Sequence, residues 1–369
     1  MRQIRKALIL SGSVGKGHDS VAEAARASFS TRKIEAEVLD CMGLLGGPGS
    51  RIGTAIFRRL LSVPTLYDGF HFSHLRTGTW LPHALEAAAS KRLVPALGER
   101  LAGAGGVDCL LAVFPTGVTA AARLKEQGAD VAVVAICTDA CAHRMWVRAG
   151  VDVYVVCSSL AANTVRRYDP SAAIAVVPPP VRPAFFEAAD QPAARAALGI
   201  AEGEPCVLLM AGGWGLGPLA DTAVTLARAG YQVLAVAGTN DRLRRRLEEA
   251  ATKDRRVHPF GFTERVPELM AAADAVVTTP GQTCHEARVV GRWLVMLDIV
   301  PGHGRENALH EIELGGALAC SPDPESVLGA VRVMFDERPE LAPWPVDGPA
   351  GWDKELFGAL EAANLRPGR

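Results

Sequence analysis

The sequence predicts an α/β protein made of two Rossmann-like domains, each built on a parallel sheet. A strand, a glycine-rich loop and a helix open the chain at Ala7–Ser30, and the same succession recurs at Cys206–Ala229. Paired openings in separate halves of a chain indicate two similar domains rather than one large sheet. The proline-rich segment Val177–Pro183 lies between the halves. Because proline interrupts helices and central strands, this segment is expected to be a linker.

The linker sets the expected domain boundaries. We expect a first domain over residues 1–184 and a second over 198–350, with the boundary near 184–200 and the two domains facing a cleft. The tail 351–369 should form a last helix that packs back on the first domain, because its large apolar residues recur at helical spacing. These residues are Trp352, Leu356, Phe357 and Leu360.

Short apolar runs predict the strands of both sheets. In the first half, strands are expected at residues 7–10, 107–114, 131–138 and 152–157. In the second half, they are expected at residues 206–210, 232–237, 257–260, 275–278 and 293–297. Nearly continuous apolar runs of this length are typical of parallel strands that are buried on both faces of the sheet.

The composition is that of a globular protein and gives no sign of a nucleic-acid partner. The chain has 369 residues, 49% hydrophobic and 21% charged, with a net charge of −1. No run reaches the ~18–20 apolar residues of a membrane span. The first apolar run is too short for a signal segment, so a cytoplasmic protein is expected. The eight cysteines lack paired ligand spacing, which favours reduced core thiols; a metal site at Cys137 and Cys141 is the weaker alternative.

One stretch of the first half, Arg51–Arg92, mixes basic residues with large apolar ones. An amphipathic basic stretch can lie on an anionic membrane, which would place the protein peripherally on the inner membrane face. The alternative interpretation is that these apolar residues simply belong to the core. The sequence leaves both interpretations open.

The two glycine loops are not the common nucleotide-binding motifs. The first lacks the Walker A pattern, because Leu10 and Gly17 occupy two of its required positions. The second does not spell G-x-G-x-x-G, which argues against a dehydrogenase. Its backbone can still cradle a diphosphate at the following helix N-terminus. No Asp-x-Asp motif occurs in the chain, so we expect no metal, with the diphosphate neutralised by amides and the helix dipole.

Two polar residues of the first half are candidates for acid–base chemistry. His18 ends the first glycine loop at a predicted helix start, where the helix N-terminus favours the neutral imidazole that a general base needs. Asp139 follows a predicted strand and could orient a base, bind an acceptor hydroxyl or cap a helix. A purely structural His18 is the alternative.

The second half gathers polar residues at the carboxyl ends of two predicted strands. In open α/β sheets that edge is where ligands bind. A carboxylate such as Glu286 can accept hydrogen bonds from both hydroxyls of a ribose. The polar residues are Thr283, His285, Glu286, His303, Arg305, Glu306 and Asn307.

These motifs, in this order, resemble the family of monogalactosyldiacylglycerol synthases and processive diacylglycerol glucosyltransferases, and more distantly the peptidoglycan lipid-linked N-acetylglucosaminyltransferase. The resemblance covers most of the chain. The residues that carry it include Gly15–His18, Thr138-Asp139 with His143 and Trp146, Pro180–Phe185, Gly212–Gly217, Gly261-Phe262, Pro280–Thr283 with Glu286, and Pro301-Gly302 with Asn307. It implies the glycosyltransferase-B fold and an inverting transfer from a UDP-sugar, with the donor in the C-terminal domain, the acceptor in the N-terminal domain and no cofactor.

The resemblance also implies roles for particular residues. His18 and Asp139 would be catalytic, the backbone at Phe262 would contact the uracil, and Glu286 would bind the ribose. The nucleotide-sugar site would comprise Gly213, Trp214, Gly215, Leu216, Gly217, Phe262, Gly281, Gln282, Thr283, Glu286, His303, Glu306 and Asn307. The acceptor site would comprise Gly15, Gly17, His143 and Trp146.

The chain departs from the family pattern at two places that would touch the sugar and diphosphate. Family members commonly have Pro-Gly-Gly where this chain has Pro280-Gly281-Gln282, and Gln-Glu where it has His303-Gly304. The sequence therefore does not determine which sugar the donor carries. The acceptor could be a lipid or a small hydrophobic natural product. The alternative functions are a UDP-sugar 2-epimerase, which needs no acceptor, and a non-catalytic nucleotide-sugar-binding protein.

Overall fold

The computed structural model describes residues 2–12, 16–44, 80–103, 105–210, 217–300 and 302–368. The chain forms two compact units, Met1–Pro180 with Val346–Arg369, and Val181–Pro345. The predicted α/β class with parallel sheets is confirmed. The division falls a few residues before the boundary predicted near 184–200, because Val181 and Phe185 are buried in the core of the second unit. Most of the segment 51–92 lies outside the described residues.

The first unit is built on a six-stranded parallel sheet in the order β3-β2-β4-β5-β6-β7. Its inner strands are almost wholly apolar because helices cover both faces of the sheet, whereas the edge strand β3 carries Glu35, Glu37 and Asp40. The strands are β2 (Lys6–Ser11), β3 (Glu35–Asp40), β4 (Cys109–Ala112), β5 (Ala132–Cys137), β6 (Val153–Val156) and β7 (Ile174–Val176).

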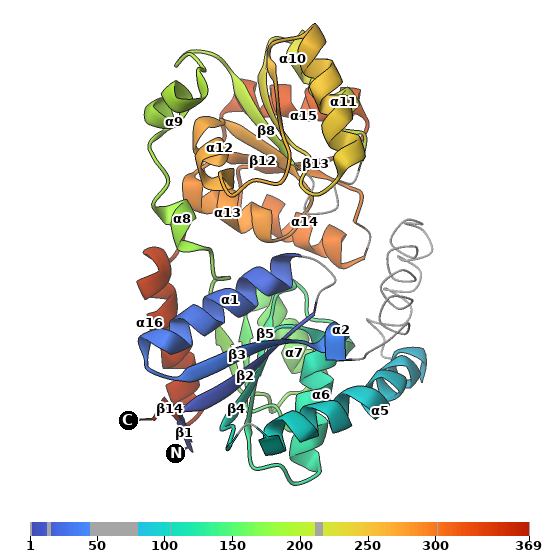
Figure 1. Ribbon diagram of the computed structural model, residues 1–369, viewed down its shortest axis with the longest axis vertical. Helices are drawn as coiled ribbons and strands as arrows, with labels where there is room; N and C mark the ends of the chain where they lie inside the picture. The colour runs from blue at the N-terminus through green and yellow to red at the C-terminus, as the bar shows by residue number, and fades with distance from the viewer. Residues whose placement is uncertain are drawn as a thin grey trace. The chain divides into compact units, whose positions relative to one another are not determined.

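Different helices cover the two faces of this sheet (Figure 1). Residues of α1 (Lys16–Thr31) and α16 (Gly348–Ala362) form the core on one face. The core on the other face is formed by α5 (Trp80–Gly103), α6 (Pro115–Glu126), the 3-10 turn η2 (Arg144–Trp146) and α7 (Ser159–Tyr168). The short helix α2 (Cys41–Leu44) follows β3.

The two ends of the chain meet in the first unit. Strand β1 (Arg2–Ile4) pairs in parallel with β14 (Leu365–Pro367) in a separate two-stranded sheet. The C-terminal helix α16 buries its large side chains in the core that it shares with α1. These side chains are Trp352, Leu356, Phe357 and Leu360.

The second unit repeats the design, with a parallel sheet in the order β10-β9-β8-β11-β12-β13. The strands are β8 (Cys206–Met210), β9 (Gln232–Val236), β10 (Val257–Phe260), β11 (Ala275–Thr278), β12 (Trp293–Leu297) and β13 (Ala317–Cys320). One face is covered by α10 (Leu219–Arg228), α11 (Asp241–Lys253) and α15 (Pro324–Glu337). The other is covered by α8 (Pro183–Phe186), α9 (Gln191–Leu198), α12 (Val266–Ala272), α13 (Gln282–Val290) and α14 (His303–Glu313).

Each sheet has one point where the strand order reverses. In the first unit the chain runs from β2 to β3 on one side and then returns to β4 on the other side of β2. In the second unit β9 and β10 lie on one side of β8, and β11 lies on the other. Such switch points are where open α/β sheets bind ligands, outside the carboxyl ends of the strands. Both candidate sites lie at such edges.

Candidate functional site

The first candidate site gathers residues that follow three adjacent strands of the first unit. His18 lies in the first turn of α1 after β2, Val113 follows β4, and Asp139 follows β5. The His18 Nδ1 atom lies 2.9 Å from the carbonyl oxygen of Val113. Because a carbonyl oxygen can only accept, Nδ1 carries the proton of the neutral ring, and Nε2 is the acceptor. The site therefore holds an imidazole whose basic nitrogen is defined by the fold.

The surroundings of His18 keep its ring neutral. Burial lowers the pKa of His18 below 6.5, while Asp139, the hydrogen bond to Val113 and Asp19 oppose that shift. The N-terminal end of α1 also disfavours a positive charge. A histidine that is neutral at physiological pH can accept a proton, so the site meets the basic requirement for a general base.

A glycine is required beside His18. The ring of Phe114 meets the His18 ring edge-on, with centroids 5.0 Å apart and an interplanar angle of 76°. A Cβ atom at Gly12 would lie 2.5 Å from the Phe114 ring, closer than real Cβ contacts come. The glycine that ends β2 therefore makes room for the aromatic ring that packs on His18. Gly15 of the predicted acceptor site lies outside the described residues, and Gly17 lies in the first turn of α1.

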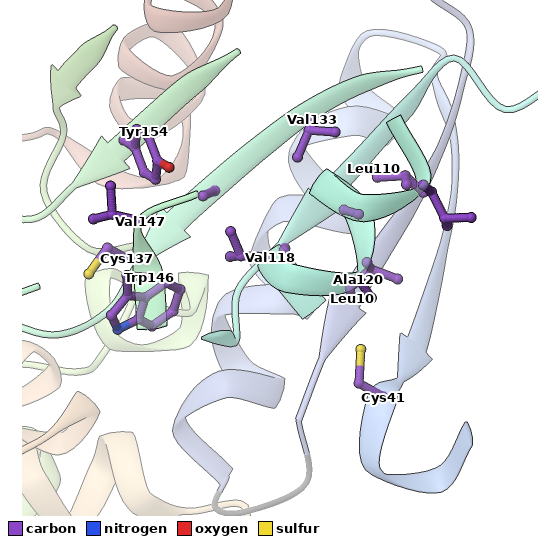
Figure 2. Close-up of a cluster of buried hydrophobic side chains, with 14 of the residues drawn as sticks. Leu10, Cys41, Leu110, Val118, Ala120, Val133, Cys137, Trp146, Val147 and Tyr154 are labelled. Carbon is purple, nitrogen blue, oxygen red and sulfur yellow. The ribbon is translucent and has the colours of Figure 1, made fainter. Parts of the chain in front are cut away.

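Two buried side chains hold the carboxylate of Asp139. Trp146 Nε1 donates to Asp139 Oδ2 at 2.7 Å, and His143 Nε2 lies 3.6 Å from the same oxygen. Trp146 is fully buried and His143 is 8% exposed. Figure 2 shows the Trp146 indole within the core of this unit, on the side of Cys137, Val147 and Tyr154. Both side chains therefore hold Asp139, and the contact with an acceptor that the resemblance implies for them stays a prediction.

The second candidate site centres on Glu286, in α13 after β11. Its carboxyl group is 8% exposed, and Oε1 lies 3.7 Å from Nη2 of Arg182. Burial raises the pKa of Glu286 to about 7, against the opposing effect of Arg182. Arg182 also stacks over the Phe185 ring at 5.0 Å and lies 3.9 Å from Glu264. The sequence placed Arg182 in a linker motif, and nothing local indicated that it would meet Glu286.

The other donor-site candidates on α13 lie in its first turn. Gly281, Gln282 and Thr283 are partly exposed where α13 begins, at a helix N-terminus whose backbone N–H groups point toward the start of the helix. His285 contacts residues of both α13 and α14: its Nδ1 lies 3.4 Å from Gln282 Oε1, and its Nε2 lies 3.5 Å from the buried carboxylate of Glu311. Arg288 Nε also donates to Glu311, at 2.5 Å. This pair joins α13 to α14, the two helices that carry the donor-site candidates.

The remaining candidates follow β12 and β10, two strands that lie apart in the same sheet. His303, Glu306 and Asn307 lie in the first turns of α14, after β12, and are partly exposed. A Cβ atom at Gly304 would lie 2.6 Å from Val300, so a glutamate cannot take this position without a shift of Val300. Phe262 follows β10 and is 68% exposed.

The glycine loop after β8 is described only at its end. Gly213, Trp214, Gly215 and Leu216 lie outside the described residues. Gly217 has a φ of +88°, a left-handed conformation that favours glycine. The helix α10 begins two residues later, so the loop leads into a helix N-terminus.

Comparison of sequences finds lipid glycosyltransferases. No protein-family model matches the chain. A processive diacylglycerol beta-glucosyltransferase of Bacillus cytotoxicus is 25% identical over 354 residues, 90% of this chain and 86% of that protein. The enzyme of that name from Bacillus licheniformis is 26% identical over 63% of this chain, and the match spans 61% of its own length. A Nicotiana tabacum protein named "Probable monogalactosyldiacylglycerol synthase, chloroplastic" is 34% identical over 43% of this chain and 31% of its own length. These names confirm the resemblance inferred from the motifs.

Comparison of structures finds proteins of the same fold. The Anabaena protein HepE in complex with UDP has a TM-score of 0.53 at 14% identity, covering 96% of this chain and 95% of its own. MurG of Acinetobacter baumannii has a TM-score of 0.54 at 12% identity and 98% coverage of both chains. A UDP-N-acetylglucosamine 2-epimerase has a TM-score of 0.59 at 14% identity, covering 99% of this chain and 97% of its own. At such identities the likeness shows the fold alone, and it confirms the glycosyltransferase-B fold.

Proposed function

We propose that the protein is a glycosyltransferase that moves a sugar from a UDP-sugar to the hydroxyl group of a lipid acceptor. The similarity over 90% of the chain to a processive diacylglycerol beta-glucosyltransferase supports the reaction class. The observation that carries the proposal is the His18 site, where Nδ1 donates to the Val113 carbonyl and Nε2 is left as a base. A neutral imidazole at a strand edge suits proton removal from an acceptor hydroxyl.

The proposed reaction is a direct displacement. Nε2 of His18 takes the acceptor proton while the acceptor oxygen forms a bond to the anomeric carbon of the donor. The bond between that carbon and the diphosphate oxygen breaks, and UDP leaves with the electron pair. Attack opposite the leaving group inverts the anomeric configuration. The negative charge of Asp139 stabilises the imidazolium that forms, since it raises the pKa of His18.

Donor binding is proposed for the second unit. Glu286 would accept hydrogen bonds from the ribose hydroxyls, and backbone amides at the starts of α10, α13 and α14 would face the diphosphate. UDP at a hundred times its dissociation constant should raise the free energy of unfolding by about 2.7 kcal/mol. A thermal-shift comparison of UDP, GDP and TDP measures this. Stabilisation by GDP or TDP but not by UDP would contradict the proposed donor class.

We propose that transfer requires no divalent cation. The chain has no Asp-x-Asp motif, so amides and helix N-termini would neutralise the leaving diphosphate. Turnover in excess EDTA should stay within about twofold of the turnover with magnesium. A twofold ratio of rates corresponds to less than RT in activation free energy. Loss of turnover in EDTA that magnesium or manganese restores would overturn this part of the proposal.

The acceptor class is proposed from the relatives and from sequence. One relative is named for diacylglycerol and another for monogalactosyldiacylglycerol. In the part of the chain that the structure describes, no helix is long and apolar enough to cross a membrane. Contact with the inner membrane face would instead come from the basic and apolar residues of the segment 51–92. Cosedimentation with anionic vesicles that weakens with salt is expected; a protein that stays in the supernatant at low salt would favour a soluble acceptor.

The epimerase alternative has one observation in its favour, the likeness of fold to a UDP-N-acetylglucosamine 2-epimerase. Such an enzyme would convert UDP-N-acetylglucosamine without an acceptor, whereas a transferase depends on one. Incubation without an acceptor separates the two functions. UDP binding without turnover of any donor, over a broad panel of acceptors, would favour a non-catalytic binding protein.

A further inference from the structure

We propose that Trp146 is a positioning residue, whose buried indole N–H fixes the carboxylate of Asp139 where it supports the charge formed on His18. The inference rests on the proposed function, in which His18 takes the acceptor proton. It goes further because it assigns the protonation behaviour of His18 to a fully buried side chain in the core.

Two ring N–H groups face the carboxylate of Asp139. The distance of 2.7 Å from Trp146 Nε1 to Asp139 Oδ2 is typical of a hydrogen bond to a charged acceptor. The His143 ring faces the same oxygen with Nε2, at 3.6 Å. Because His143 Nδ1 accepts from the backbone N–H of Met145 at 3.3 Å, the proton of the neutral His143 ring lies on Nε2. Both rings therefore present an N–H group to one carboxylate oxygen.

Hydrogen bonds also hold the backbone around Asp139. The thiols of Cys137 and Cys157 lie 3.7 and 3.5 Å from the Asp139 carbonyl oxygen, as donors. Ser158 Oγ donates to the Ala140 carbonyl at 3.4 Å. The next part of the loop is tied to α7, where the Ala142 N–H donates to Thr164 Oγ1 at 2.9 Å. Because both the backbone and the side chain of Asp139 are held, its carboxylate needs little reorganisation when charge develops nearby.

The charge of Asp139 acts on the His18 ring. The charged groups that act on the His18 ring, among the described residues, are Asp139 and Asp19, and the larger effect comes from Asp139. Asp19 is itself held, since its Oδ1 accepts from Ser11 Oγ at 2.9 Å. Loss of the indole N–H would remove the shorter of the two N–H contacts to the Asp139 carboxylate and fix its position less tightly. The imidazolium of His18 would then lose support, so the pKa of His18 should fall further.

The test replaces one indole with a smaller aromatic ring that has no N–H group. Trp146→Phe removes the N–H donor to Asp139. The matched control is Trp352→Phe, in the same unit, which removes an indole N–H that donates to the Pro178 carbonyl at 3.0 Å. For both variants, NMR titration of the His18 ring, the donor KM, kcat and its pH profile are measured.

Trp146→Phe should lower kcat by about 10- to 100-fold, the factor equivalent to a hydrogen bond to a charged group. The donor KM should stay near the wild-type value, because the proposed donor contacts lie in the other unit. The His18 titration and the acid limb of the kcat profile should both move to lower pH, and Trp352→Phe should move neither. A merely structural role would give Trp146→Phe an unchanged His18 titration, and that result would overturn the proposal.

The His18 titration and one further variant keep the positioning role of Trp146 separate from the proposed function. The His18 titration needs no turnover, so it tests the positioning role even if the wild-type protein transfers no sugar. If Trp146→Phe does not fold, His143→Phe removes the second N–H that faces Asp139 and should move the titration in the same direction. A titration that His143→Phe leaves at the wild-type value would then overturn the proposal.

Discussion

His18→Ala is expected to lower turnover by at least about 100-fold while the affinity for UDP stays near that of the wild type. Loss of a general base typically costs 10²–10⁴ in rate. The fold presents Nε2 of His18 as the proton acceptor, because Nδ1 is committed to the Val113 carbonyl. The candidate donor contacts, such as Glu286, belong to the second unit. Steady-state kcat with one acceptor and calorimetry with UDP measure the two expectations.

The matched control is His258→Ala, a second histidine whose pKa burial also lowers. Its Nε2 lies 2.8 Å from Gln232 Oε1 in the second unit, so its loss should leave turnover near the wild-type value. Asp139→Asn decides between the two candidate bases. Near wild-type turnover in His18→Ala beside an inactive Asp139→Asn would move the base to Asp139 and leave His18 as a loop-shaping residue.

The pH profile gives an independent check on His18. Its pKa lies below 6.5, so the ring is neutral at pH 7, and kcat should fall only as the pH drops through that lowered value. Asp139 raises the pKa of His18 against the effect of burial. Asp139→Asn should therefore move the acid limb of any remaining activity to still lower pH.

Glu286→Gln is expected to stabilise the protein at pH 8 while it weakens UDP binding. Burial raises the pKa of this carboxyl from 4.5 to about 7, so the folded state holds its proton over a range where the unfolded state has lost it. The wild type therefore loses stability as the pH rises from 4.5 to 7. Glutamine has no such titration, and the free energy of unfolding should rise by about 1–3 kcal/mol at pH 8, since one pKa unit is equivalent to 1.36 kcal/mol.

The same variant should bind UDP more weakly by about 1–3 kcal/mol, the cost of losing a charged hydrogen-bond partner. The affinity of the wild type should increase as the pH rises through 7 and the carboxyl ionises, and the affinity of Glu286→Gln should not. Glu264→Gln is the control: its side chain is 79% exposed and also lies near Arg182, at 3.9 Å. Unchanged UDP affinity in Glu286→Gln would remove Glu286 from the site. A loss of stability at pH 8 would make it a structural partner of Arg182.

Much of the fold could be predicted because most of its buried strands are short apolar runs in the sequence. The strands 206–210, 275–278 and 293–297 match β8, β11 and β12, since parallel strands covered on both faces are apolar along almost their whole length. The pairing of β1 with β14 joins the two ends of the chain, and no local periodicity could reveal it. Burial of Phe185 in the second unit could not be read from the sequence for the same reason, because it depends on the tertiary fold.

The candidate site was predictable in its position but not in its contacts. His18, Asp139 and Glu286 each follow a strand, and this position is visible in the sequence. The direction in which a side chain points is not, which is why the hydrogen bond from Trp146 to Asp139 was not predicted. Arg182 was missed because its partner Glu286 lies about 100 residues further along the chain. Such contacts between distant segments arise only when the sheet edge forms.

The most direct test of the account is a transfer assay with radiolabelled UDP-glucose, UDP-galactose and UDP-N-acetylglucosamine, each mixed with vesicles that contain diacylglycerol. The account predicts labelled glycolipid from at least one donor, with one UDP released for each sugar transferred, and at least about a 100-fold loss of product in His18→Ala. Turnover of the donor that proceeds equally without any acceptor would contradict it. So would donors that remain intact throughout an extended panel of lipid and small hydrophobic acceptors.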